Sequence, residues 1–76
     1  MVKALTLVTV LPGKVSAASE GIKEVKGVKE VLVVAGRADI IVFFEGSFEE
    51  IAEIVSEIGR VEGVTTTETL VELVGY

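Results

Sequence analysis

The chain has 76 residues, and its 12 acidic against 7 basic side chains give a net charge of −5 at pH 7. This length allows one domain, residues 1–76, of a size that buries only about 60% of its unfolded surface, so we expect a partner to stabilise it. His and Cys are absent, which removes the usual general base, disulfides and the commonest metal ligands. The acidity disfavours direct nucleic-acid binding. We therefore expect no catalytic residues, metal or cofactor.

Location and source are indicated only weakly. No run approaches the roughly 18 apolar residues of a membrane span, and the segment from Met1 to Ala17 imitates a signal peptide only faintly. We therefore expect a cytoplasmic protein without a membrane partner. The absence of Asn, Gln and Cys beside abundant Glu and Lys hints at a thermophilic source.

The first half of the chain reads as strand, helix and hairpin. Residues 2–11 are rich in Val, Leu and Thr and end at a Pro-Gly breaker, which predicts a strand. Residues 14–26 carry apolar side chains at spacings of three and four, typical of a helix. Gly21, in its middle, costs roughly 1 kcal/mol against Ala. Two strands, Val28–Ala35 and Ile40–Glu45, then flank a turn over residues 36–39.

The second half contains one helix and one strand. Ser47 and Glu50 have the spacing of a capping box, so a helix is predicted to begin at Ser47 and to end at Gly59. A broad core stripe is expected along this helix, made of Phe48, Ile51, Ala52, Ile54, Val55 and Ile58. Its glutamates are interpreted as a solvated face. The β-branched segment Val64–Val74 predicts the last strand.

The two halves contain an internal echo. The segments 25–28 and 61–64 both read Val-x-Gly-Val and lie 36 residues apart, each at the end of a predicted helix. The order β-α-β-β-α-β predicts a ferredoxin-like α+β fold, with a four-stranded antiparallel sheet, strands one and three in its centre, and two helices on one face.

The other face of this sheet should be polar in a monomer. In the predicted strands at residues 2–11 and 40–45, however, apolar side chains occur at both odd and even positions, so both faces of the sheet are apolar there. Two helices can cover only one face. We therefore predict a face-to-face homodimer, an α+β barrel-like assembly that could associate further. The alternative, a small core whose strands are simply apolar on both sides, stays open.

Three segments together resemble one known family. They are Gly-Val-x-x-Val at 27–31, Gly-Arg-Ala-Asp-Ile-Ile at 36–41, and Glu-Gly-Val-Thr-Thr-Thr-Glu-Thr-Leu at 62–70. In order and spacing the chain resembles the effector-binding (RAM) domain of the Lrp/AsnC, or feast/famine, transcriptional regulators, without their helix-turn-helix domain. The resemblance covers nearly the whole chain. It implies a ferredoxin-like domain that dimerises through its sheet, forms octamer- or decamer-like rings and binds a small amino acid.

The resemblance also implies a ligand site at Gly36, Asp39, Thr67 and Thr69, and we add Arg37 and Ala38 of the same hairpin tip. For Arg37, pairing with a glutamate of a neighbouring subunit and a solvated turn charge are the alternatives. Asp39 could bind an ammonium group, while loop N–H groups, threonine hydroxyls and Arg37 could bind a carboxylate. Thr65, Thr67 and Thr69 alternate along the predicted strand and would share one side. Each has a structural alternative: a turn residue for Asp39, β propensity for the threonines. Ala38 departs from the family, where an aromatic residue is usual.

The leading hypothesis is an amino-acid-sensing and oligomerisation module that modulates a full-length Lrp/AsnC regulator by co-assembly. A small dimeric α+β barrel enzyme, such as a monooxygenase, is an alternative, but few proton-transfer groups are left for it. An RRM-like RNA-binding sheet would need aromatic residues on its central strands and positive charge. A purely structural assembly unit is the remaining alternative.

Overall fold

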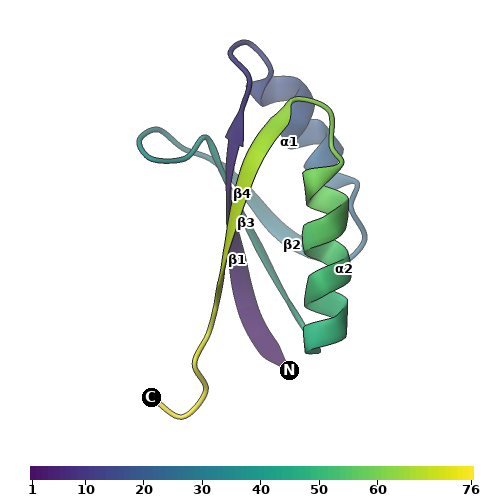
Figure 1. Ribbon diagram of the computed structural model, residues 1–76, viewed down its shortest axis with the longest axis vertical. Helices are drawn as coiled ribbons and strands as arrows, with labels where there is room; N and C mark the ends of the chain where they lie inside the picture. Colours follow the sequence, from purple (N-terminus) through teal and green to yellow (C-terminus); the bar gives the residue numbers. More distant parts are fainter.

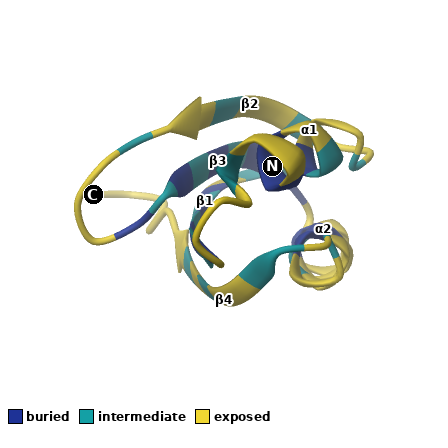
Figure 2. Ribbon diagram, turned by 90° about the horizontal axis from the view of Figure 1, so that it is seen from above, coloured by how far each residue is buried: buried dark blue, intermediate teal, exposed yellow.

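The computed structural model describes all 76 residues and forms a two-layer α+β structure (Figure 1). Its elements in chain order are β1 (Val2–Val10), α1 (Val15–Lys23), β2 (Val28–Val33), β3 (Ile40–Gly46), α2 (Phe48–Gly59) and β4 (Val64–Val71). The sheet order is β2-β3-β1-β4, and every neighbouring pair is antiparallel. Both helices lie on the same side of the curved sheet (Figure 2). The predicted ferredoxin-like fold is confirmed.

Several elements are shorter than predicted. The strand β2 ends at Val33, and a loop over residues 34–39 replaces the predicted four-residue turn. This loop is closed by one backbone hydrogen bond, in which the Val34 N–H donates to the Asp39 carbonyl at 2.9 Å. The helix α1 covers nine residues, because the N–H groups of Glu24 and Val25 donate to carbonyls three residues back, in a tightened last turn. β4 ends at Val71.

The capping box of α2 is confirmed. The Glu50 N–H donates to the Ser47 hydroxyl at 3.1 Å, and the Ser47 N–H donates to Glu50 Oε1 at 2.8 Å. The predicted core stripe was too broad. The fully buried side chains of α2 are Ile51, Ile54 and Ile58. Phe48 is 69% exposed, because the first turn of α2 follows directly on the end of β3 and lies at the rim of the sheet; Ala52 is exposed as well.

The internal echo is a structural repeat. Gly27 and Gly63 both have positive φ, +98° and +95°, and each follows a helix that ends in right-handed backbone conformation. A side chain added at Gly27 would lie 2.8 Å from Ile54, and one added at Gly63 would lie 2.9 Å from Lys14 and 3.8 Å from Ala18. Ala18 and Ile54 are 36 residues apart, as Gly27 and Gly63 are. Each turn therefore packs against the helix of the other half.

The core lies between the helices and the sheet. Its buried residues are Ala4, Val8, Val10, Ala18, Ile22, Ile40, Val42, Phe44, Ile51, Ile54 and Ile58. A polar residue, Thr6, is fully buried among them, and its hydroxyl is hydrogen-bonded to the Thr69 hydroxyl at 2.9 Å. None of the helices is both long and apolar enough to span a bilayer.

Candidate functional site: the hairpin tip and the open face

Asp39 fixes the end of the central strand pair. Its N–H donates to the Val8 carbonyl at 2.9 Å, and its Oδ2 accepts a hydrogen bond from the Val10 N–H, also at 2.9 Å. As an alternative to ligand binding, Asp39 was expected to bond only to backbone of its own turn. Its carboxylate instead accepts from a residue of β1 that lies 29 positions earlier in the chain. A second oxygen, Oδ1, has no hydrogen-bond donor in the chain.

The rest of the tip offers free donors. Gly36 has φ +125°, and no heavy atom lies within 4 Å of where its side chain would begin. Arg37 is exposed and forms no ion pair. The N–H groups of the exposed residues Ala35, Gly36 and Arg37 donate no hydrogen bond within the chain. Ala38, in contrast, is buried at the base of the loop. The loop therefore carries unused hydrogen-bond donors and, at its end, one carboxylate oxygen without a donor.

Thr67 and Thr69 lie on the opposite side of the sheet from the tip carboxylate. In the register, Thr67 pairs with Val8 and Thr69 with Thr6, and both of these partners face the helices. Thr65 does not join them, because it is the extra residue of a β-bulge and its hydroxyl donates to the Thr9 carbonyl at 3.0 Å. The expectation that three threonines act together is therefore corrected to two.

A single chain does not bring the tip and the threonines into one cleft. β1 separates β3 from β4, and continuing the β1–β3 register beyond the Val8–Ile40 pair places Asp39 beside Thr9, on the face away from the helices. The threonine pair faces the helices. A ligand that touches both groups would therefore need a second chain to complete its site.

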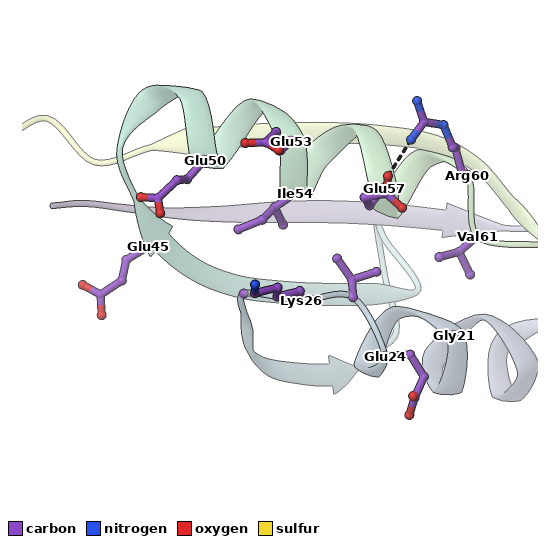
Figure 3. A pocket seen from close by; sticks show the side chains of 12 residues that line it. Gly21, Glu24, Lys26, Glu45, Glu50, Glu53, Ile54, Glu57, Arg60 and Val61 are labelled. Carbon is purple, nitrogen blue, oxygen red and sulfur yellow. Dashed lines mark hydrogen bonds and ion pairs between the residues drawn. The ribbon is translucent and has the colours of Figure 1, made fainter.

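Between the two helices lies a shallow groove of about 630 Å³ (Figure 3). The charged residues that line it are Glu24, Lys26, Glu45, Glu50, Glu53, Glu57 and Arg60, with Glu45 at the end of β3. Several of these charges already have partners, since Arg60 pairs with Glu57 and Glu50 completes the capping box. The hydrogen bond from the Ser47 backbone lowers the pKa of Glu50 below its usual range. No residue of the predicted ligand site lines the groove. The sequence pattern indicated the glutamates of α2 only as a solvated helix face, and it did not predict a groove there.

The face of the sheet away from the helices, called the open face below, carries a contiguous apolar centre. It is made of Leu5, Leu7, Leu32, Ile41, Phe43 and Leu70. Leu5 pairs with both Phe43 and Leu70, and Ile41 pairs with both Leu7 and Leu32, so the six side chains adjoin one another. Leu32 and Leu70 are 41% and 50% exposed. Such a patch across four strands marks an interaction surface.

The edges of the sheet are less suited to association than its face. Both edge strands contain a bulge, at Lys29 in β2 and at Thr65 in β4. Both edge strands also carry a charge: Glu30 of β2 pairs with Phe43 and Glu68 of β4 pairs with Leu7, so these two carboxylates flank the apolar centre at the edges of the open face. Bulges and charges are devices that discourage pairing between exposed strands of different molecules. A partner is therefore expected on the open face.

Comparisons with known proteins define the class. No family model and no curated protein matches the sequence. Among solved structures, TTHA0845 from Thermus thermophilus is 33% identical, with a TM-score of 0.91, and the match covers 100% of this chain and 98% of that one. FFRP-DM1 is 28% identical, with a TM-score of 0.85, over 96% of this chain and all of that one. The protein is thus a ferredoxin-like domain, and its matches to these two structures extend over nearly the whole length of each solved chain.

Larger regulators contain the same fold. A feast or famine regulatory protein of M. tuberculosis (Rv3291c), solved in complex with L-methionine, is 17% identical with a TM-score of 0.79. E. coli AsnC is 16% identical with a TM-score of 0.82. The match covers 96% and 95% of this chain but half of each regulator. This chain therefore has the fold of FFRP-DM1 and of one half of each of these feast/famine regulators.

Proposed function

We propose that the protein is an amino-acid-sensing and oligomerisation module, which pairs through its open face and modulates a full-length Lrp/AsnC regulator by co-assembly. The observation that carries this proposal is the hairpin tip, where free N–H donors and Arg37 lie within four residues in sequence of Asp39, one of whose carboxylate oxygens has no protein donor. A free α-amino acid needs this combination, because it carries one anionic and one cationic group.

The ligand site would be completed by a neighbouring subunit. Thr67 and Thr69 of the same chain face the helices, away from Asp39. In an assembly of several copies, the tip of one chain can meet the threonines of another. This arrangement would link ligand binding to the oligomeric state, and octamer- or decamer-like rings are the expected assemblies. The neighbour solved with L-methionine supports an amino acid as the ligand class.

The test is a thermal-shift and calorimetric titration with the common amino acids, beginning with L-methionine. Asp39→Ala is a poor probe, because it leaves the Val10 N–H without its acceptor. Asp39→Asn is sharper, since its amide oxygen can still accept from Val10 while the charge is removed. We expect Asp39→Asn to retain the wild-type melting temperature and to lose at least about tenfold in ligand affinity, as charge-assisted hydrogen bonds contribute roughly 1.5–3 kcal/mol.

The control is Glu53→Gln, which removes one exposed carboxylate of α2 far from the tip and should bind as the wild type does. Equal affinities for wild type and Asp39→Asn would contradict the proposed role of the tip. If no amino acid shifts the melting temperature and the wild-type chain still assembles, the protein is a structural assembly unit. A stable monomer at micromolar concentration in light scattering would contradict the pairing of open faces.

A further inference from the structure

One end of the open face carries a row of four charges, one from each of β1, β2 and β3 and one from the residue that follows β4. Lys3 of β1 pairs in register with Glu45 of β3, and Lys29 at the bulge of β2 contacts Glu45, with Nζ to Oε1 at 2.8 Å. On the other side, the Glu72 N–H donates to the Lys3 carbonyl, which extends the register of β4. Across the sheet, the row therefore reads Glu72, Lys3, Glu45, Lys29, and its signs alternate.

This charged row lies beside the apolar centre, on the same face. Glu45 follows Phe43 by two residues, and Lys3 precedes Leu5 by two, so their side chains point to the open side of the sheet. The hydrogen bond from Lys29 lowers the pKa of Glu45, and the positive charges of Lys29 and Lys3 act in the same direction. All four residues retain exposed side-chain surface, and Lys3 forms no ion pair in the chain.

A row with alternating signs is complementary to its own reversal. If two copies pack their open faces together about a two-fold axis parallel to the strands, the strand order of one copy is reversed over the other. Glu72 then lies over Lys29 of the second copy, and Lys3 lies over Glu45. Packed sheets are separated by about 10 Å, a gap that Lys and Glu side chains can bridge from both sides. In an isologous contact, each of these pairs forms twice.

The other face-to-face arrangement is less favourable for the same charges. With the two-fold axis perpendicular to the strands, the two ends of the sheet exchange places. Glu45 then lies over Asp39, a pair of like charges, and Lys3 lies over the uncharged Thr9. Like charges that meet in an interface cost several kcal/mol and select against that arrangement.

We propose that this charged row orients a second copy of the chain on the open face, with the two-fold axis parallel to the strands. The inference rests on the face-to-face pairing of the proposed function and specifies its geometry. It has a consequence for the ligand site. The hairpin tips lie at the end of the sheet far from the N-terminus (Figure 1), so both tips of the dimer lie at one end and Asp39 lies over Thr9 of the second copy.

The test uses Lys3→Glu and Glu45→Lys, alone and mixed, with dissociation constants measured by sedimentation. Each variant alone places two like-charged pairs across the interface and should self-associate at least about tenfold more weakly than the wild type. In an equimolar mixture, the introduced glutamate of one chain meets the introduced lysine of the other, and every position of the row is again opposite in sign. We expect the mixture to associate within about threefold of the wild type.

The controls separate this effect from folding and from net charge. A chain that fails to fold cannot be restored by mixing. Lys3→Glu makes the chain more acidic and Glu45→Lys makes it less acidic, so a net-charge effect would move the two in opposite directions. Glu53→Lys, on the exposed side of α2, carries the same charge change as Glu45→Lys and should leave association unchanged.

Each result decides the inference. Stronger association of Glu45→Lys alone would indicate the perpendicular arrangement and overturn the proposal. A wild-type dimer that neither variant weakens, or a mixture no tighter than the separate variants, overturns the orientation and leaves face-to-face pairing intact. A monomeric wild type overturns the pairing itself.

Discussion

We predict that helix α1 needs a glycine at position 21, because α1 lies close to the residues that follow α2. Glycine is kept there although it has a low helix propensity. A side chain begun at Gly21 would lie 2.8 Å from Val61 Cγ1, whereas carbon atoms in contact prefer about 3.5–4.0 Å. In an open helix, Gly→Ala stabilises by roughly 1 kcal/mol. Here overpacking costs about 1–3 kcal/mol, so Gly21→Ala should lower the free energy of unfolding by up to about 2 kcal/mol.

The same contact predicts a change of sign. Without Cγ1, the nearest Val61 atom is Cβ at 3.9 Å, an ordinary contact. In a Val61→Ala background, Gly21→Ala should therefore stabilise the protein by roughly 1 kcal/mol. The matched control is Gly59→Ala, at the end of α2, where no atom lies within 4 Å and stabilisation by up to about 1 kcal/mol is expected.

The assay is urea unfolding of all variants at one protein concentration, because the proposed dimerisation would make stability depend on concentration. A Gly21→Ala variant that is about 1 kcal/mol more stable than the wild type, like the Gly59 control, would refute the close contact with Val61.

Two further predictions concern polar groups of the fold. The lowered pKa of Glu50 means that the stability from its capping hydrogen bonds is present at neutral pH and is lost as the pH falls through the folded-state pKa. On acidification, the free energy of unfolding of the wild type should therefore fall more steeply than that of Glu50→Gln. Parallel curves of stability against pH would contradict this. Thr69→Val should cost about 1–3 kcal/mol, because it leaves the fully buried Thr6 hydroxyl without its partner, whereas Thr6→Val should stay within about 1 kcal/mol since part-exposed Thr69 can bind water. Denaturant melts in which the two variants cost the same would contradict that asymmetry.

Much of the fold could be predicted because its signals are local. The Ser47–Glu50 box satisfies N–H groups of its own helical turn, and the matching glycines 27 and 63 adopt positive φ within their own turns. Alternation of apolar side chains on two faces predicted the open face before its register was known. Element ends were less predictable, since β2 and β4 stop before their apolar sequence does.

The site was less predictable because it depends on pairing across long separations. Nothing near Asp39 in the sequence indicates that its carboxylate accepts from Val10. The face on which Thr67 and Thr69 lie follows from a register that a bulge at Thr65 shifts. Likewise, Lys29 and Glu72 become members of one charged row only when the strand order is known.

The reciprocal packing of the two turns bears on how the chain folds. Gly27 of the first half is seated against Ile54, and Gly63 of the second half against Ala18. Each half therefore supplies the surface on which the turn of the other is built, and the central strands β1 and β3 also come from different halves. Neither half has a complete core of its own. The molecule should consequently fold and unfold as one cooperative unit, although its sequence contains an internal repeat.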